Sequence, residues 1–347
     1  MYPFFIRINA KAHHHQPGCS RSGCFHPDGF ARDQQPLRCR PETRLRVQEA
    51  VARLGYQPNA IARGLASRRS RTLGLITTDF TDYSFTQVVT GAEAEAHKDD
   101  YFFMLGSASC DPEDEPKYLR LLTERHVEGV LFARLGGQDD LENLMSNLEK
   151  REVAVVTTGS HRPETPFAQV DINNQEGGYK ATHCLLQNGH TQIACITGPL
   201  SAQSAFDRTQ GYRQAMAEAG IACQPQLVVE GEYTHRSGYS AMKIILASGQ
   251  PFTALFAESD RMAIGALSAL HEAGRRVPED ISVVGYDDIP EAEFANPPLT
   301  TLRQPMEAVG AAAARLLIKM VEDPEAAAEQ ILFETELVWR ASVAPCQ

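Results

Sequence analysis

The chain has 347 residues, which at about 100–200 residues per domain predicts more than one domain. Hydrophobic residues make up 43% of the sequence, enough for ordinary globular cores, and no apolar run reaches the length of a membrane span. The formal net charge of −11 argues against non-specific binding of nucleic acid by the molecule as a whole.

The first residues carry no recognisable export signal. Met1–His15 starts with a short apolar stretch but has neither a continuous apolar region nor a small-residue cleavage site. The 8 cysteines are scattered, and Cys184 and Cys195 fall in apolar segments where a reduced, buried thiol is the simplest interpretation. We therefore expect a cytoplasmic protein with free thiols.

Residues 1–40 have neither helical nor strand periodicity and are dense in Pro, Gly, His, Cys and Arg. Four potential zinc ligands lie in this segment: Cys19, Cys24, His26 and Cys39. Their spacing matches no standard zinc finger, and no amphipathic helix carries a ligand pair. We expect a disordered or aberrant N-terminal segment and no bound metal.

A helical segment follows. Three apolar residues stand at helical spacing: Val47, Val51 and Leu54. Gly55 can end this helix in a left-handed conformation, and Pro58 can open a second, short helix from Asn59 to about Ala66. The two predicted helices lead directly into an apolar strand, Leu73–Ile76.

Basic residues are concentrated in the same part of the chain. Between residues 40 and 71 they are Arg40, Arg44, Arg46, Arg53, Arg63, Arg68, Arg69 and Arg71. Only Glu42 and Glu49 oppose them. A basic segment attached to an acidic body is what a confined phosphate-binding surface requires.

From Thr72 onward, strand and helix patterns alternate, which favours parallel sheets with crossover helices. We expect strands at Leu73–Thr77, Tyr101–Gly106, Val127–Ala133, Val153–Thr157, Ala168–Asp171, Gln192–Ile196, Leu227–Val229, Ala254–Ala257 and Ser282–Tyr286. We expect helices at Ser84–Lys98, Glu113–Glu124, Asp139–Glu149, Gln175–Gln187, Ala205–Ala219, Ser237–Ala247, Met262–Ala273 and Met306–Val321. The pattern predicts an α/β fold of two doubly wound parallel-sheet subdomains with a ligand cleft beyond the carboxyl ends of the strands.

Four segments, in this order, resemble the LacI/GalR (lactose-repressor) family of transcription factors: EGGYKATHCLLQNGHTQIACITGP, DRTQGYRQAMAEAG, SDRMAIGALSALHEAGRRVPEDISVVGYDDI and PPLTTLRQP. The resemblance covers nearly all of Thr72–Val343 and implies the family's periplasmic-binding-protein-like body. In the family the chain crosses between the two halves three times, which here falls near Asp171, Leu302–Gln304 and Glu334. The implied subdomains are residues 72–172 plus 304–334 and residues 173–303 plus 335–347.

Pro41–Ile76 is similar to the last headpiece helix, hinge helix and linker of the same family, so residues 41–71 are expected to be a remnant DNA-binding headpiece with its hinge. In the family, the hinge helices of a homodimer enter the minor groove of operator DNA and insert a leucine pair. The matching residues here are Asn59, Ala62, Arg63 and Leu65. A segment this short is not stable alone, so it is expected to order on DNA. The alternative is a linker helix that packs Ile61 and Leu65 against the body.

The family's helix-turn-helix, which reads close to DVAxxAGVSxxTVSRVLN, is absent upstream of this segment. Back-translation of Gly23–Gln35 with a shift of one nucleotide permits Gly-Val-Ser-Thr-Arg-Thr-Val-Ser-Arg-Val-Ile-Asn-Asn, and Gly18–Ser22 permits Val-Ala-Arg-Ala-Ala. We therefore hypothesise that residues up to about Arg40 are an out-of-frame translation of the recognition module. The alternative is an unrelated N-terminal extension. Without a recognition helix, only contacts that position the protein on DNA remain.

The resemblance implies a small carbohydrate-type effector between the halves. The implied contacts are Asp79, Ser84, Phe85, Asn173, Ser204, Arg208, Tyr233, Asp260 and Asp287. Carboxylates and a forked guanidinium suit vicinal hydroxyl groups, and an aromatic ring gives an apolar face for the sugar. Asn173 stands where the family often has an acidic residue. The alternatives are that Asp260 caps helix Met262–Ala273 and that Asp79 caps a turn.

The sequence contains no phosphate loop, nucleophile elbow or zinc-protease motif, so neither catalysis nor a cofactor is expected. The first interpretation is an effector-responsive, homodimeric repressor of carbohydrate use that binds operator DNA and no membrane. The second is a sugar-binding protein of the same fold that has lost specific DNA binding. The third, an enzyme on this scaffold, has no catalytic constellation to support it.

Overall fold

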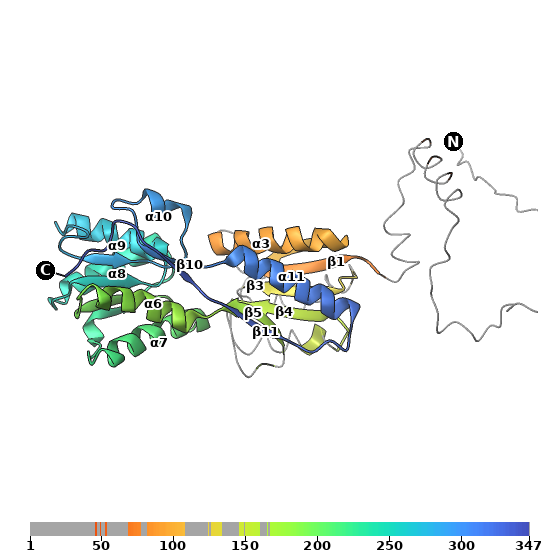
Figure 1. Cartoon of the computed structure of the whole chain (residues 1–347), viewed down its shortest axis with the longest axis horizontal. Coiled ribbons are helices and arrows are strands. Elements are labelled where there is room, and N and C mark those ends of the chain that lie inside the picture. The colour runs from red at the N-terminus through yellow and green to blue at the C-terminus, as the bar shows by residue number, and fades with distance from the viewer. Residues whose placement is uncertain are drawn as a thin grey trace, which may run out of the picture. The chain divides into compact units, whose positions relative to one another are not determined.

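The structure is a computed structural model that describes residues 69–77, 82–107, 126–133, 150–159 and 167–346, together with residues 46, 49, 53, 124, 146–148 and 165. The chain divides into two units, Met1–Asn59 and Ala60–Gln347. The N-terminal segment and the hinge lie outside the described residues, as does most of the predicted helices Glu113–Glu124 and Asp139–Glu149. The second unit contains both predicted sheets, and it is described below (Figure 1).

The first sheet has six parallel strands in the order β11-β5-β4-β3-β1-β2. Their bounds are β1 Thr72–Thr77, β2 Phe102–Ser107, β3 Gly129–Ala133, β4 Ala154–Thr158, β5 Ala168–Ile172 and β11 Gln330–Phe333. Every residue of β1, β3 and β5 is buried, as expected for a parallel sheet that is covered on both faces. The last strand comes from a segment far along the chain.

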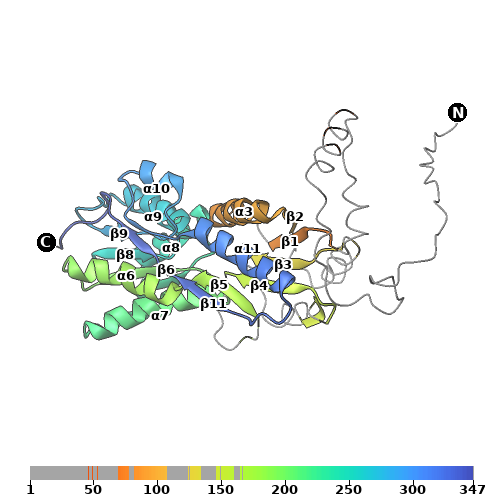
Figure 2. The same ribbon diagram turned by 45° about the vertical axis from the view of Figure 1, so that its right-hand side comes forward.

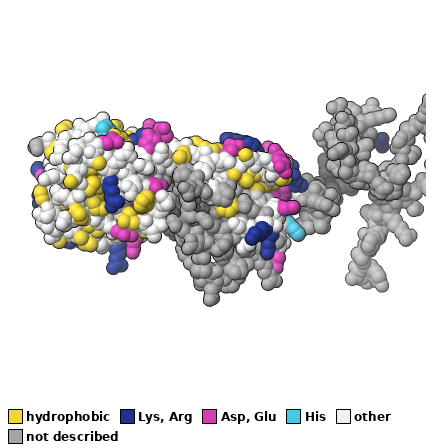
Figure 3. Space-filling view, turned by 90° about the horizontal axis from the view of Figure 1, so that it is seen from below, with side chains coloured by type: hydrophobic (Ala, Val, Ile, Leu, Met, Phe, Trp, Pro, Cys, Tyr) yellow, Lys and Arg dark blue, Asp and Glu magenta, His cyan; other side chains and the backbone are white. Residues whose placement is uncertain are grey.

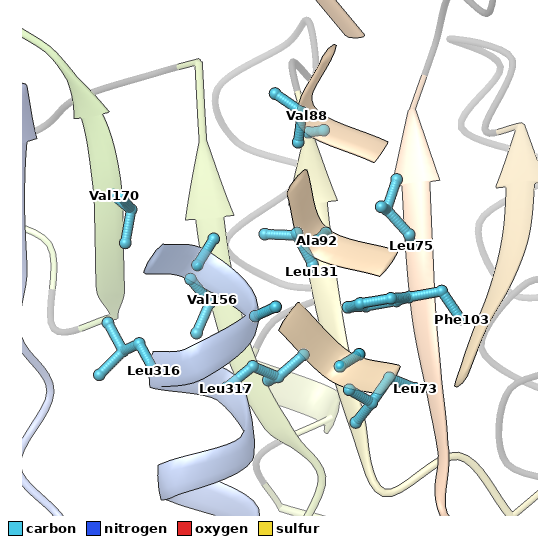
Figure 4. Packing of buried hydrophobic residues seen from close by; sticks show 14 of the residues in the cluster. Leu73, Leu75, Val88, Ala92, Phe103, Leu131, Val156, Val170, Leu316 and Leu317 are labelled. Carbon is cyan, nitrogen blue, oxygen red and sulfur yellow. The ribbon is translucent and has the colours of Figure 1, made fainter. Parts of the chain in front are cut away.

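Two helices, α3 (Tyr83–Ala96) and α11 (Met306–Glu322), lie side by side on one face of this sheet (Figures 1 and 2). Leu75, Leu131 and Val156 point from the strands toward Val88 and Leu317 of the helices (Figure 4). A second cluster, around Ile76, Val130 and Phe132, fills the other face. The period-2 alternation of the strand side chains thus supplies both faces of the sheet.

The second sheet has four parallel strands in the order β7-β6-β8-β9. The strands are β6 Ile193–Thr197, β7 Val228–Glu230, β8 Ala254–Ala257 and β9 Ser282–Val284. The helices are α6 Asn174–Gln187, α7 Gln203–Glu218, α8 His235–Ala247, α9 Asp260–Glu272 and the short α10 Pro290–Phe294. Tyr212 of α7 packs in the core cluster that contains Leu185 of α6, and Met262 and Leu270 of α9 pack in the one that contains Met242 of α8.

The chain passes between the two sheets three times. It runs from β5 directly into α6, then from β10 (Thr301–Arg303) into α11, and finally from β11 into β12 (Glu336–Val338). β10 and β12 pair antiparallel to each other. Each half is therefore assembled from segments that are far apart in the sequence.

Pairs of glycines bring neighbouring helices into backbone contact. A Cβ on Gly91 of α3 would lie 1.9 Å from Glu307 O of α11, and one on Gly310 of α11 would lie 2.1 Å from Val88 O of α3. The same reciprocal arrangement joins α6 to α7 and α8 to α9, through Gly178, Gly211, Gly238 and Gly265. Because each partner lacks a Cβ where the other approaches, the three helix pairs pack more closely than side chains would allow.

The predicted α/β fold of two wound parallel sheets is confirmed. α10, β10, β11 and β12 were not predicted from the sequence, and the predicted strand Ser282–Tyr286 runs beyond β9, which ends at Val284. Cys184 and Cys195 are buried and free, as predicted. Among the described residues, no helix is both long and apolar enough to cross a membrane.

Candidate ligand-binding site

A cavity lies at the carboxyl ends of β3, β4 and β5, beside α7 and the segment that follows β9, the usual place for a ligand in wound α/β folds. It contains about 510 Å³ of empty volume, open solvent included. Residues that precede α6 in the chain contribute Ser84, Phe85, Val88, Ala133, Thr158, Gly159, Asp171 and Ile172. Later residues contribute Asn174, Ser204, Arg208, Asp287, Gln304 and Met306. The described lining thus combines polar and charged side chains with apolar residues such as Phe85, Val88 and Met306.

Among the described residues of this lining, Arg208 is the only cation, and it is almost fully buried. Its Nε donates to Asn174 Oδ1 at 2.8 Å and its Nη1 donates to Glu258 O at 2.6 Å. The guanidinium carbon lies 3.8 Å from the centre of the Tyr286 ring, a stacking contact typical of arginine. Burial alone lowers the pKa of Arg208, but Tyr286, Tyr233 and Asp287 raise it above its ordinary value, so the guanidinium stays charged.

Two carboxylates face this cation or lie near it in the cavity. Asp287 Oδ1 is 3.8 Å from Arg208 Nη1 and accepts a hydrogen bond from Gln304 Nε2 at 2.7 Å. Asp171 is the next-to-last residue of the buried strand β5, and its Oδ1 accepts from the backbone N–H of Ile172 at 2.7 Å. The lining therefore carries one positive and two negative groups.

Glu258 lies directly behind Arg208 and is fully buried. Its Oε2 accepts from the Gly198 N–H at 2.8 Å, and its Oε1 accepts from Thr209 Oγ1 at 2.7 Å. Burial raises the pKa of Glu258 to about 8, and the two hydrogen bonds and Arg208 oppose this rise only in part. At neutral pH the Glu258 carboxyl is therefore largely protonated and uncharged, so Asp287 is the carboxylate that pairs with Arg208.

The Asp287 backbone is strained. Its φ is 115°, and Asp288 follows with a φ of 56°, both in a region that residues with a Cβ rarely adopt. Asp288 holds this turn, because its carboxylate pairs with Arg303 Nε and with Arg340 Nη2, each at 2.7 Å. Strain of about 1–3 kcal/mol per residue is typical of ligand-binding positions that the surrounding structure fixes.

Thr158 completes the polar lining. Its Oγ1 is buried and has no hydrogen-bond partner in the described part of the chain, although Thr158 lines the cavity. A buried hydroxyl without a partner costs about 1–3 kcal/mol, which a ligand hydroxyl at this point would recover.

Comparison with known proteins places the chain in a family. Residues 182–343 match the family described as periplasmic binding protein-like domain. The HTH-type transcriptional repressor PurR of Aliivibrio fischeri (strain MJ11) is 37% identical over 305 residues, which cover 87% of this chain and 89% of PurR. The chain belongs to the LacI/GalR family of transcriptional regulators. The resemblance inferred from the four sequence segments is therefore confirmed.

Solved structures of LacI/GalR regulators agree with this assignment. A complex of the transcriptional regulator CelR with cellobiose is 34% identical, with a TM-score of 0.74, and the match covers 88% of this chain and 92% of CelR. The lac repressor bound to ONPG in its repressed state is 27% identical, with a TM-score of 0.79 and coverage of 89% and 93%. A LacI family regulator from Enterococcus faecium with bound ribose is 28% identical, with a TM-score of 0.70 and coverage of 80% and 100%.

Five of the nine residues that the LacI/GalR resemblance implied as effector contacts line the cavity: Ser84, Phe85, Ser204, Arg208 and Asp287. Tyr233 lies beside it, with its hydroxyl 3.4 Å from Ser204 Oγ and its ring centre 5.9 Å from the Arg208 guanidinium carbon. Asp79 and the four expected hinge residues, Asn59, Ala62, Arg63 and Leu65, lie outside the described residues.

Asn173 and Asp260 do not line the cavity. Asn173 caps α6, where its Oδ1 accepts from the Glu176 N–H at 3.2 Å, and the neighbouring Asn174 faces the cavity instead. Asp260 is fully buried in the first turn of α9, accepts from the Ile289 N–H at 2.9 Å, and also bonds to the Thr301 hydroxyl. The alternative that Asp260 caps its helix is also wrong, because Ser259 does so.

Several lining or supporting residues were not anticipated from the sequence: Thr158, Asp171, Asn174, Glu258, Tyr286 and Gln304. Thr158 and Asp171 stand at the carboxyl ends of predicted strands, so the strand-end rule could have found them. Glu258 and Tyr286 contact Arg208, and no sequence pattern predicts those contacts.

Proposed function

We propose that this chain is a transcriptional repressor whose affinity for operator DNA is controlled by a small, neutral carbohydrate bound in the cavity. The observation that carries the proposal is the buried pair of Arg208 and Asp287 at the junction of the two wound halves. A carboxylate accepts hydrogen bonds from sugar hydroxyls, and a guanidinium donates to them, both with charge assistance. Phe85 supplies the apolar surface on which a sugar ring can lie.

The charge of the lining supports a neutral effector over an anionic one. Arg208 is already compensated by Asp287, and Asp171 adds a further negative charge. Glu258 adds none while it is protonated. A phosphate or carboxylate group on the effector would be repelled by these two aspartates and would find no free cation in the described lining. The CelR complex with cellobiose and the E. faecium regulator with ribose are consistent with a carbohydrate.

DNA binding is assigned to the basic segment between Arg40 and Arg71, acting in a homodimer. On the face drawn in Figure 3, acidic and basic side chains are interspersed over the described residues and form no large patch of one sign. An operator contact through Asn59, Ala62, Arg63 and Leu65 remains a prediction, as does cytoplasmic localisation.

A second candidate is a carbohydrate-binding protein of the same fold that does not bind DNA specifically. The observation that favours it is the lack of a helix-turn-helix pattern in residues 1–40. Both candidates bind the same ligand, and they differ only in whether they bind a specific DNA sequence.

The ligand is tested by calorimetry of the full chain with cellobiose and D-ribose, and with glucose 6-phosphate as the anionic counterpart. We expect saturable binding of a neutral sugar; at a concentration 100 times its Kd it would stabilise the fold by about 2.7 kcal/mol. Binding of only the phosphorylated sugar would contradict the proposal.

Sequence-specific DNA binding is tested by selecting the duplexes that the chain binds from a random pool at moderate salt. Recovery of one sequence supports the repressor. Salt-labile binding of every duplex supports the second candidate, since phosphate contacts alone do not read sequence.

A further inference from the structure

The chain enters the first sheet through residues 69–71, and one carboxylate holds all three of them. Glu128 stands immediately before β3, with 13% of its side chain exposed. Its Oε1 accepts from the Arg71 backbone N–H at 2.6 Å and from Ser70 Oγ at 3.2 Å. Its Oε2 accepts from Arg69 Nη1 at 3.3 Å. We call Glu128 and residues 69–71 the Glu128 clamp.

The backbone around the clamp is held in an unfavourable conformation. Arg71 has a φ of 55°, which is uncommon for a residue with a Cβ and persists only where its surroundings fix it. The hydrogen bond from the Arg71 N–H to Glu128 fixes it on one side. On the other side, the Glu128 N–H donates to Thr72 O at 2.9 Å and so begins the pairing of β1 with β3.

The arginines of the clamp also reach the end of α11. Arg69 Nη1 donates to Val321 O at 3.2 Å, and Arg71 Nη1 lies 3.5 Å from Glu322 Oε1. Arg71 Nη1 donates in addition to Asp99 O at 3.0 Å. The segment is therefore tied both to the amino end of β3 and to the carboxyl end of α11.

Both of these elements line the ligand cavity at their other ends. β3 ends at Ala133, and α11 begins at Met306; both residues belong to the lining. α11 has 17 residues, which at 1.5 Å per residue span about 25 Å from the cavity to the clamp. Two continuous, hydrogen-bonded elements thus join the ligand site to the point where the basic segment meets the body.

We propose that Glu128 is the positioning residue that fixes the linker to the body, so that a ligand-driven shift of β3 or α11 is passed to the chain before Arg69. The transmission to DNA rests on the proposed function. The holding of residues 69–71 by Glu128 does not, so the two can fail separately.

Hydrogen exchange of the full chain, followed by mass spectrometry, tests the clamp without any ligand. In Glu128→Ala the Arg71 amide is expected to exchange roughly tenfold faster or more, because it loses a charge-assisted acceptor. Glu128→Gln, which keeps a neutral acceptor and the side-chain shape, is expected to lie between this variant and the parent chain. Glu128→Gln also serves as the test variant if Glu128→Ala does not fold.

Glu329→Gln serves as the matched control, because Glu329 pairs with Lys319 on the exposed side of α11 and contacts none of residues 69–71. It should leave exchange at Arg71 unchanged. Equal exchange of Arg71 in the parent chain, Glu128→Ala and Glu128→Gln would overturn the proposal.

A second measurement uses cellobiose and D-ribose as probes. A sugar that binds the parent chain is expected to alter exchange at residues 69–72, and Glu128→Ala should abolish that change while its affinity for the sugar stays within about twofold. If Glu128 only stabilised the fold, its replacement would change the ligand-induced exchange and the affinity for the sugar together. A ligand-induced change that persists in the variant overturns the proposal. If neither sugar binds, the proposed function is contradicted, and exchange at Arg71 in the absence of ligand still decides the clamp.

Discussion

Arg208 combines the two requirements of a buried recognition group. Its charge is offset by Asp287 at 3.8 Å, its Nε donates to Asn174, and its Nη1 donates to a backbone carbonyl, which reduces the free energy lost by burying it. The stacked Tyr286 ring fixes the plane of the guanidinium. A ligand that enters the cavity therefore meets a preorganised donor rather than a mobile side chain.

Arg208→Lys should reduce affinity for the effector by at least about tenfold, because a lysine ammonium cannot reproduce the forked donor or the stacking on Tyr286. Calorimetry measures the affinity, and thermal unfolding checks that the variant is folded. Arg213→Ala, an exposed arginine on the same helix, is the control and should bind as the parent chain does. Equal affinity in Arg208→Lys would remove Arg208 from the binding site.

Glu258 should make the fold less stable as the pH rises. Its pKa is about 8 in the folded chain and near 4.5 when unfolded, so the folded state binds the proton more tightly between these values. The stabilisation is complete below about pH 4.5 and is lost as the pH approaches 8, by up to about 1.4 kcal/mol per pH unit.

Glu258→Gln is expected to flatten this part of the pH profile, measured by urea unfolding at pH 5, 6.5 and 8. The exposed Glu232→Gln provides the comparison and should keep the parent slope. Asp260, whose pKa burial also raises, remains in both variants and sets the residual dependence. An identical slope in the parent chain and in Glu258→Gln would show that Glu258 is ionised throughout.

At the scale of the elements, the reciprocal glycines decide how the helices pair. Helix propensity alone favours alanine over glycine by about 1 kcal/mol, so six glycines within paired helices are unfavourable locally. Each removes a Cβ that would meet a backbone atom of the partner at about 2 Å. Close packing across the pair therefore outweighs local propensity.

Gly310→Ala should destabilise the chain by about 1–3 kcal/mol in urea unfolding, because its new Cβ would lie 2.1 Å from Val88 O. Thr90→Ala, at an exposed position on the facing helix α3, tests propensity without the clash and should change stability by less than about 0.5 kcal/mol. A stabilised Gly310→Ala variant would mean that α3 and α11 can separate at no cost.

The sequence predicted the longer elements well and the short ones poorly. Strands such as Ile193–Thr197 are continuous apolar runs, and the helices between them have strong periodicity. β10 and β12 have 3 residues each and form only because they pair with each other across at least 32 intervening residues. Such pairing leaves no local pattern, so no reading of neighbouring residues could have found them.

The candidate site was predictable to the extent that it follows strand ends. Arg208 and Asp287 were identified from the family resemblance, and both line the cavity. Asn173 and Asn174 could not be distinguished, because the backbone direction at the start of α6 decides which side chain caps the helix. Asp260 was misplaced because its partner Thr301 lies 41 residues away in sequence.

For the molecule as a whole, the nucleotide sequence that encodes residues 12–40 is the decisive observation on DNA binding. Read one nucleotide later, the codons for Gly23–Gln35 are expected to encode Gly-Val-Ser-Thr-Arg-Thr-Val-Ser-Arg-Val-Ile-Asn-Asn. If these codons are present, a chain translated in that frame should bind one operator sequence, whereas the present chain should show the weak, salt-dependent binding that distinguishes the second candidate. Codons that do not permit this peptide would eliminate the hypothesis.

The threefold crossing between the halves also sets an order of completion on the ribosome. β1 is synthesised first among the described strands, yet its sheet lacks β11 until residue 333 has been added, about 250 residues later. At about 5–20 residues per second this takes about 12–50 s. Once β5 has been synthesised, its edge stays unpaired until β11 is added, and the apolar face of the sheet is open to solvent until α11 covers it. The second sheet has all four of its strands by residue 284, so the sheet whose first strand is translated first is the sheet that is completed last.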